Sequence, residues 1–515
     1  MKFSMRAMTR VAASVGFVAL FSTVMGCSSN PPGDTAAAGA ESAGRSGSPA
    51  TAGAGGRTSA AAGAGSAAAG GNAAGASTSG GADPGASGAA GSGSMAGGAA
   101  GGAALGGSGG ATGGGGTAGA AVGGAAQGGA AGAGGETAKP GPPMGWASWN
   151  SFAAKIDASV IKGQADALVA SGLKAAGYQY VNIDEGWWQG TRDSAGNITV
   201  DQAEWPGGMK AIAEYIHGLG LKAGIYTDAG KDGCGYYFPT GRPAAPGSGS
   251  EGHYEQDFLA FSQWGFDFVK VDWCGGDKEK LDAQTAYKGI ASAIEKATKQ
   301  TGRPLALSVC NWGVQSPWNW APALSTMWRT SYDIIYYGEA ADMKRVLANF
   351  DSAQHPGAQS PGHYNDPDML IVGMSGFSGA QNRSHLALWA ILGAPFLAGN
   401  NLATMSADTK SVLANAEVIA IDQDPLAKQG VRLSDDQGKQ VYNKVLSGNA
   451  RRAVLLLNRS TAAASMTVRF ADLGLGAAAT VRNVWTAQDL GPQSTSYSAT
   501  VPAQDSLLLL VTGAQ

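Results

Sequence analysis

Short apolar runs alternate with amphipathic stretches between residues 142 and 427. The strand-like runs are Pro143–Trp149, Gln179–Asp184, Lys222–Asp228, Phe266–Asp272, Leu305–Cys310, Thr326–Asp333, His363–Leu370 and Pro395–Asn400. Between most of them lie helical patterns, such as Val160–Ala176, Met209–Leu219, Tyr254–Trp264 and Leu281–Thr298. Alternating strand and helix signals favour a parallel sheet, and eight such units predict an α/β fold, a (β/α)8 barrel, over residues 139–427.

The pattern changes after residue 427, where short strand-like runs follow one another without helices between them. These runs are Gln440–Leu446, Ala453–Asn458, Ser465–Phe470, Thr480–Trp485, Tyr497–Val501 and Ser506–Thr512. They predict an antiparallel β-sandwich over residues 428–515. This part has few carboxylates or aromatic residues that would form a site, so we interpret it as a packing domain, with carbohydrate binding as the alternative.

The first residues have the pattern of an export signal. A basic segment, residues 1–10, precedes an apolar one, residues 11–25, that is too short to span a bilayer comfortably. The sequence Val24-Met25-Gly26-Cys27 resembles a bacterial lipoprotein signal, which predicts a signal peptide over residues 1–27 and lipidation of Cys27. The alternative is an ordinary secretory signal with an accidental cysteine. Because Ser28 rather than Asp follows, we expect an outer-membrane anchor that holds the protein in the periplasm or at the cell surface.

Residues 28–138 consist almost entirely of Gly, Ala, Ser and Thr. Such a segment cannot bury enough apolar surface to offset the entropy of ordering, so we predict a disordered tether between membrane and globular part. The whole chain of 515 residues carries a net charge of −3, which gives no reason to expect nucleic acid as a partner.

Candidate chemistry gathers where two predicted strands end. Residues two apart on a strand point the same way, so Lys270 and Asp272 project from one face. A cation beside a carboxylate keeps it ionised, which is the state that a carboxylate nucleophile needs. About sixty residues on, Arg329 and Asp333 lie at the end of another strand. The two pairs indicate acid/base or covalent chemistry on a neutral polar substrate; the alternative is a structural ion pair in a barrel.

In an oxidising compartment two of the cysteines Cys234, Cys274 and Cys310 are expected to pair. Cys234 and Cys274 each follow a strand end, so a bridge across neighbouring loops is plausible. The cysteine spacings do not suit a zinc site, and no metal is expected.

From Pro142 to its C-terminus the chain resembles glycoside hydrolase family 27, the α-galactosidase/melibiase group of clan D. The motifs that carry the resemblance are Met144–Asn150 (MGWASWN), Asn182–Trp187 (NIDEGW), Gly224–Gly230 (GIYTDAG), Tyr254–Asp257 (YEQD), Lys270–Cys274 (KVDWC), Trp328–Asp333 (WRTSYD) and Asn365–Met369 (NDPDM). They stand in the family's order and cover the whole predicted barrel. The family fold, a (β/α)8 barrel followed by an antiparallel β-sandwich, agrees with the pattern of strands and helices.

The resemblance implies a retaining exo-glycosidase that releases terminal α-D-galactosyl residues from oligo- or polysaccharides without a metal or cofactor. Asp272 would be the nucleophile and Asp333 the general acid/base. The residues implied to bind the sugar are Trp149, Asp184, Glu185, Tyr226, Lys270, Asn311, Arg329, Asp368 and Met369. The resemblance also supports a disulfide between Cys234 and Cys274. The five histidines match no catalytic role in the family, and we interpret them as surface or loop residues.

Two residues depart from the family pattern. Glu185 stands where the family usually has Asp, and its carboxylate reaches about 1.3–1.5 Å further, into the space of the C6 hydroxymethyl group. This departure favours a β-L-arabinopyranosidase as the alternative activity, because that sugar is galactose without the hydroxymethyl group. Asn311 replaces a common Glu that meets the 2-hydroxyl, yet an amide still donates and accepts, so selectivity between galactose and N-acetylgalactosamine stays open. A catalytically silent surface sugar-binding protein is a third possibility, against which the two carboxylates with their basic neighbours argue.

Overall fold

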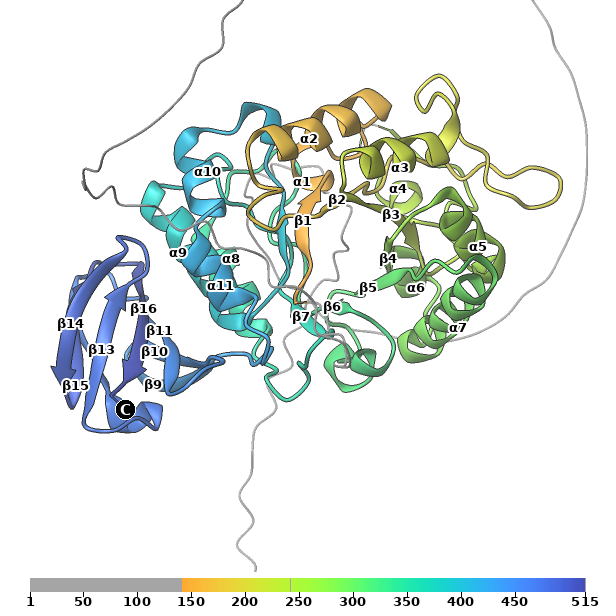
Figure 1. Cartoon of the computed structure of the whole chain (residues 1–515). Coiled ribbons are helices and arrows are strands. Elements are labelled where there is room, and N and C mark those ends of the chain that lie inside the picture. The colour runs from red at the N-terminus through yellow and green to blue at the C-terminus, as the bar shows by residue number, and fades with distance from the viewer. Residues whose placement is uncertain (1–140, 241, 515) are drawn as a thin grey trace, which may run out of the picture. The chain divides into compact units, whose positions relative to one another are not determined.

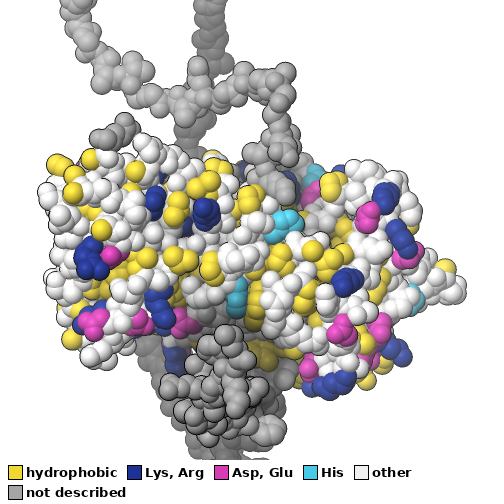
Figure 2. Space-filling model, turned by 90° about the horizontal axis from the view of Figure 1, so that it is seen from below, with side chains coloured by type: hydrophobic (Ala, Val, Ile, Leu, Met, Phe, Trp, Pro, Cys, Tyr) yellow, Lys and Arg dark blue, Asp and Glu magenta, His cyan; other side chains and the backbone are white. Residues whose placement is uncertain are grey.

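The computed structural model describes residues 141–240 and 242–514. The predictions made for the signal peptide, for Cys27 and for the linker of residues 28–138 lie outside the described residues. None of the helices in the described ranges is long and apolar enough to cross a membrane. On the face that Figure 2 shows, acidic and basic side chains are interspersed, so this face carries no extended field of one sign.

Eight parallel strands form the first sheet (Figure 1). They are β1 (Met144–Ala147), β2 (Tyr180–Asn182), β3 (Lys222–Asp228), β4 (Phe268–Asp272), β5 (Ala306–Cys310), β6 (Met327–Arg329), β7 (Tyr364–Asp366) and β8 (Phe396–Ala398). They pair in the order β7-β6-β5-β4-β3-β2-β1-β8. The segment after β7 closes the ring, because Leu370 forms a parallel bridge with Ala398 of β8. The (β/α)8 prediction is confirmed. Most strands are shorter than the predicted runs, because the polar residues at the ends of these runs form loops rather than strand hydrogen bonds.

Helices surround this sheet, as Figure 1 shows for α2, α3, α5 and α7. They are α1 (Trp149–Phe152), α2 (Ala158–Ala170), α3 (Gly208–Gly218), α4 (Cys234–Tyr237), α5 (Tyr254–Trp264), α6 (Cys274–Lys278), α7 (Ala283–Thr301), α8 (Met343–Ser352), α9 (Gly379–Leu392), α10 (Ala407–Leu413) and α11 (Ala416–Asp422). Local sequence sets their ends. The Asp282 side chain caps α7 by accepting from the backbone N–H of Thr285, and Gly302 ends this helix with a left-handed φ of 73°.

The C-terminal part consists of two antiparallel sheets. The larger has the order β14-β13-β16-β11-β10-β9 and the smaller pairs β12 with β15. Their bounds are β9 (Val431–Asp436), β10 (Lys439–Val445), β11 (Arg451–Asn458), β12 (Ala464–Arg469), β13 (Ala478–Asn483), β14 (Gln488–Ser494), β15 (Ser496–Val501) and β16 (Asp505–Gly513). The predicted sandwich is confirmed. Its pattern did not reveal β9, all of whose residues are exposed, or β14, which contains Gly491 and Pro492.

Helix α9 packs against the sandwich as well as within the barrel layer. Its Ser384 hydroxyl donates to the Asp505 carboxylate of β16 at 2.8 Å. His385 of the same helix is fully buried, and its Nε2 accepts the backbone N–H of Ile371 at 3.0 Å. Burial lowers the pKa of His385 to about 3, so the imidazole is neutral. The interpretation of all five histidines as surface or loop residues is therefore wrong for His385, because α9 is buried continuously from Ser384 to Leu392.

Candidate active site

Asp272 ends β4 and is fully buried. Its Oδ1 accepts the backbone N–H of Trp273 at 2.9 Å and the indole N–H of Trp312 at 3.2 Å. Its Oδ2 accepts the hydroxyl of Tyr226, on β3, at 3.1 Å. Burial raises the pKa of Asp272 to about 6, although Lys270, the Trp273 N–H and the Tyr226 hydroxyl each lower it. The carboxylate is thus mostly ionised at neutral pH, with its position fixed from three sides.

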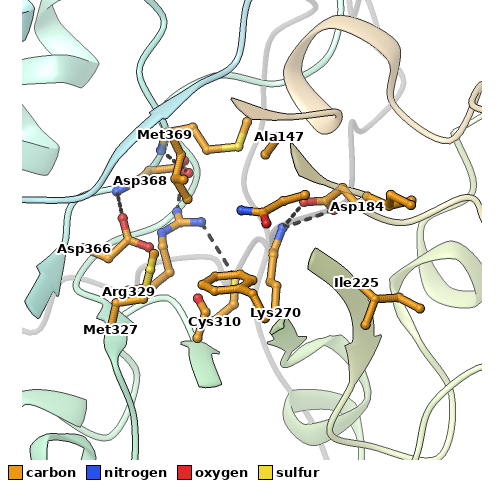
Figure 3. Close-up of a pocket in the computed structure, with 15 residues that line it drawn as sticks. Ala147, Asp184, Ile225, Lys270, Cys310, Met327, Arg329, Asp366, Asp368 and Met369 are labelled. Carbon is orange, nitrogen blue, oxygen red and sulfur yellow. Dashed lines mark hydrogen bonds and ion pairs between the residues drawn. The ribbon is translucent and has the colours of Figure 1, made fainter. Parts of the chain in front are cut away.

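Lys270, two residues earlier on β4, lies on the same face as Asp272, as predicted, and Figure 3 shows it pointing toward Asp184. Its ammonium nitrogen lies 2.8 Å from Asp184 Oδ2 and 4.0 Å from Asp272 Oδ2. Burial alone would lower the pKa of Lys270, but the carboxylates of Asp184 and Asp272 raise it above its usual value. Lys270 therefore forms its shorter ion pair with Asp184, which follows β2, and its expected contact with Asp272 is the longer one.

Asp333 lies in the loop after β6, and Arg329 at the end of that strand holds it. The Arg329 guanidinium lies 3.1 Å from Asp333 Oδ1 and 3.1 Å from Asp368 Oδ2. Asp333 Oδ2 is buried and has no hydrogen-bond partner among the described residues. Burial raises the pKa of Asp333 well above its usual value; Arg329 counteracts this effect, and the carboxylate of Asp368 adds to it. The environment of Asp333 therefore favours its protonated form more than that of an exposed carboxyl group.

Asp368 joins the loop after β7 to the loop after β6. Its Oδ2 accepts the backbone N–H of Ile334 at 2.8 Å, and its own N–H donates to Asp366 Oδ1 at 2.8 Å. The backbone φ of Asp368 is 90°, a region that a non-glycine residue occupies only at a cost of about 1–3 kcal/mol. These contacts hold the strained turn in place and fix Arg329 between two carboxylates.

A cavity opens between the Lys270–Asp184 pair and the Arg329–Asp368 pair (Figure 3). Five of the predicted sugar-binding residues line it: Asp184, Lys270, Arg329, Asp368 and Met369. Its floor consists of barrel-interior side chains that include Phe268, Met327 and Leu397. Asp272 and Asp333 are not among the lining residues, but Lys270 and Arg329 connect them to it.

Four predicted sugar-binding residues also lie outside the cavity lining. Tyr226 is buried and contacts Asp272, and Trp149 packs in the apolar cluster that contains Met369. Glu185 Oε1 accepts the backbone N–H of Gly235 in a short contact. Asn311 donates to the carbonyl of Val314, while its buried Oδ1 has no partner in the described part of the chain.

The predicted disulfide between Cys234 and Cys274 is present, with a Cα–Cα distance of 5.0 Å. It joins the start of α4 to the start of α6, two residues beyond Asp272. Sulfur and carboxylate atoms of Asp228, Cys234, Asp272 and Cys274 lie within 4.8 Å of one another. Because both sulfurs belong to the disulfide, this cluster offers two carboxylates rather than a metal donor set.

Two residues near Asp272 had no role assigned from the sequence. Trp312 follows Asn311 at the end of β5 and donates to Asp272. Asp228 ends β3, is fully buried, and accepts the backbone N–H of Cys274 at 2.7 Å and of Gly275 at 3.1 Å. Both residues lie in segments at strand ends that the sequence analysis had already identified as candidates. Their position at the end of a strand could have pointed to them.

Comparisons with known proteins agree with this geometry. Residues 141–424 match the family described as "Alpha galactosidase A", and residues 436–511 match "Alpha galactosidase C-terminal beta sandwich domain". A protein of Cellvibrio japonicus named alpha-galactosidase A is 41% identical over 322 residues, which cover 61% of this chain and 75% of that protein.

Two solved structures extend the comparison. The crystal structure of α-galactosidase I from Mortierella vinacea is similar with a TM-score of 0.65 and 31% identity, covering 73% of this chain and 97% of that one. A GH27 β-L-arabinopyranosidase from Geobacillus stearothermophilus also has a TM-score of 0.65, at 24% identity, with the same coverages of 73% and 97%. At that identity the second likeness shows the fold alone.

Proposed function

The chain belongs to glycoside hydrolase family 27, and from this membership and the site we infer that it is an exo-acting α-galactosidase. It releases terminal α-D-galactosyl residues from oligo- or polysaccharides by a retaining double displacement, with Asp272 as nucleophile and Asp333 as general acid/base. Catalysis belongs to the barrel of residues 139–427, and residues 428–515 serve as a packing domain.

In the first step a carboxylate oxygen of Asp272 bonds to the anomeric carbon while the glycosidic C–O bond breaks. The electron pair of that bond goes to the departing oxygen, which takes the proton of Asp333. In the second step Asp333, now ionised, removes a proton from water. The water oxygen bonds to the anomeric carbon, and Asp272 leaves as a carboxylate.

The difference between the two carboxyl environments carries this assignment. Asp272 receives three hydrogen bonds and has a pKa of about 6, which suits an ionised nucleophile. Asp333 has a pKa raised well above its usual value and a buried Oδ2 without a partner in the described part, which suits a proton donor. Lys270, Asp184, Arg329 and Asp368 supply charged hydrogen-bonding groups for the sugar hydroxyls.

The leaving group separates the two roles experimentally. Asp333→Ala should lower kcat/KM about 10²–10⁴-fold on raffinose-type galactosides but little on a dinitrophenyl α-galactoside, whose leaving group needs no proton. Asp272→Asn should abolish turnover of both substrates. Equal losses of both substrates in Asp333→Ala would contradict the assignment of the acid.

A second candidate activity, β-L-arabinopyranoside hydrolysis, rests on Glu185. This side chain is 7% exposed, and its Oε1 accepts the backbone N–H of Gly235, which lies in α4 beside the disulfide. The Glu185 carboxylate, which is longer than that of the usual Asp, therefore has a partner within the protein. The discriminating measurement is kcat/KM on p-nitrophenyl α-D-galactopyranoside and β-L-arabinopyranoside. A preference for the galactoside supports the leading function, and a preference for the arabinoside makes Glu185 the residue that sets specificity.

The N-terminal sequence supports export as a lipoprotein, with lipid attached to Cys27, the linker of residues 28–138 as a tether, and an outer-membrane location. Labelling with radioactive palmitate in cells tests this proposal. Label should enter the wild type and the Ser28→Ala control but not Cys27→Ser. Label retained by Cys27→Ser would refute lipidation at this residue.

A further inference from the structure

Helix α9 connects the C-terminal sandwich to the turn that carries Asp368. Figure 1 shows this helix beside the sheets of the sandwich. There the Ser384 hydroxyl donates to Asp505 of β16 at 2.8 Å, and the buried ammonium of Lys444 in β10 donates to the carbonyl of Ala390 at 2.9 Å. The sandwich therefore holds α9 in place at two points, which makes the helix a rigid support for what it contacts in the barrel.

Helix α9 also holds both ends of the segment from Asp368 to Ile371. The indole N–H of Trp389 donates to the backbone carbonyl of Asp368 at 2.9 Å. The backbone N–H of Ile371 donates to Nε2 of His385 at 3.0 Å. Trp389 and His385 are fully buried, and their ring centroids lie 4.2 Å apart, so each ring limits the movement of the other. Two adjoining aromatic side chains of one helix thus fix this short segment.

The segment that α9 holds is strained and carries a charged side chain of the site. Asp368 has a φ of 90°, a value that a non-glycine residue keeps only where the surrounding structure fixes it. Its carboxylate lies 3.1 Å from the Arg329 guanidinium (Figure 3) and accepts the N–H of Ile334 at 2.8 Å. Because the carbonyl and the carboxylate belong to the same residue, the hydrogen bond from Trp389 to the carbonyl restricts the backbone that aims the carboxylate.

The position of Asp368 affects Asp333, since both carboxyl groups share Arg329. The charged or titratable groups that face Asp333 are Arg329, Asp368, Lys270, Asp272 and Tyr336. Burial raises the pKa of Asp333; Asp368 and Asp272 add to this effect, whereas Arg329 and Lys270 counteract it. If Asp368 moved away, Arg329 would pair with Asp333 alone and a nearby negative charge would be lost. Both changes lower the pKa of Asp333, so it would lose its proton more readily.

From these observations we propose that Trp389 is a positioning residue for the general acid/base. It holds the backbone carbonyl of Asp368, which keeps the Asp368 carboxylate on Arg329 and leaves Asp333 with only a share of the guanidinium. The proposal rests on the α-galactosidase function, in which Asp333 gives its proton to the departing oxygen. It adds to that function a residue of the surrounding helix layer, which acts through the backbone of Asp368.

The test removes the indole donor and keeps an aromatic ring, as Trp389→Phe does. His385→Phe is the second variant, because it removes the acceptor at the other end of the segment. Trp146→Phe is the matched control, because the fully buried indole of Trp146 also donates to a backbone carbonyl at 2.9 Å, that of Asn400. Urea unfolding of each variant measures the stability that the loss of a buried hydrogen bond costs.

Two further measurements on the full chain address the positioning role. The first is kcat/KM between pH 4 and pH 9 on raffinose and on a dinitrophenyl α-galactoside, whose leaving group needs no proton. The second is hydrogen exchange of the Ile334 amide, which donates to the Asp368 carboxylate. The exchange rate reports on the turn independently of activity.

In Trp389→Phe and His385→Phe the basic limb of the raffinose profile should move to lower pH by about half a unit or more, a threefold change in proton affinity. The basic limb on the dinitrophenyl substrate should stay in place, and Trp146→Phe should move neither. The Ile334 amide should exchange at least about threefold faster in Trp389→Phe than in Trp146→Phe.

A raffinose profile that stays in place in Trp389→Phe, or equal shifts on both substrates, would overturn the positioning role. An Ile334 amide that exchanges as in wild type would also overturn it, whether or not the enzyme is active. A wild type inactive on both galactosides would instead refute the proposed function, while exchange at Ile334 still decides whether Trp389 holds the turn.

Discussion

Replacing Tyr226 by Phe should shift the pH dependence of catalysis, because it removes a hydrogen bond to Asp272, the proposed nucleophile. The Tyr226 hydroxyl donates to Asp272 Oδ2 at 3.1 Å, and this hydrogen bond lowers the pKa of Asp272. Phe keeps the ring and removes only the donor. Because a hydrogen bond to the ionised form favours that form, its loss must raise the pKa of Asp272 above its present value of about 6.

The magnitude follows from the strength of a hydrogen bond to a charged group. Such a bond is worth about 1.5–3 kcal/mol, and each pKa unit corresponds to about 1.36 kcal/mol, so the expected rise is about 1–2 units. The lower end applies here, since Trp273 and Trp312 still donate to the other oxygen. With a rise of about one unit, the ratio of kcat/KM at pH 8 to that at pH 5 should increase about tenfold.

The assay is kcat/KM on dinitrophenyl α-galactoside between pH 4 and pH 9, a substrate for which the acid Asp333 is not limiting. A ratio between two pH values is insensitive to any uniform loss of sugar binding in the variant. Tyr215→Phe is the matched control, because the Tyr215 hydroxyl also donates to a carboxylate, that of Asp166, at 2.8 Å on the exposed side of α3. An acidic limb that stays in place, or moves to lower pH, would refute the reasoning.

Three further changes have defined outcomes. Asp272→Asn should reduce kcat on the order of 10⁴-fold or more with the fold intact, measured by burst kinetics and circular dichroism; substantial residual turnover would exclude Asp272 as nucleophile. The double variant Cys234→Ser/Cys274→Ser opens a cross-link with a sequence separation of 40, so urea unfolding should show a loss of about 4 kcal/mol, and an unchanged midpoint would contradict it. Glu185→Asp should raise the ratio of galactoside to arabinoside kcat/KM, and a ratio that does not move would remove Glu185 from specificity.

The order of strands could be predicted from the sequence because each strand is indicated by a local pattern of residues. Each apolar run of the barrel predicted a strand that the structure contains, and α5 has the predicted bounds Tyr254–Trp264. Elements without a regular pattern were missed, as in β9, which lies at the edge of its sheet with every residue exposed. Alternation arises only when one face of a strand is buried, so an exposed strand leaves no such pattern in the sequence.

By itself the sequence determined that Lys270 and Asp272 lie on the same face of a strand. It also determined that the polar ends of the strands lie together at one end of the barrel. A two-residue period on a strand and the parallel direction of barrel strands are sufficient for both conclusions. Only the tertiary structure decided that Lys270 pairs more closely with Asp184, 86 residues away, than with its neighbour Asp272. It also decided that Trp312 donates to Asp272. These contacts depend on which strands become neighbours when the barrel closes and on how side chains from different strands fill the space between them. Burial raises the pKa of both Asp272 and Asp333, and their proposed roles rest on this effect, because desolvation acts on three-dimensional position rather than on sequence.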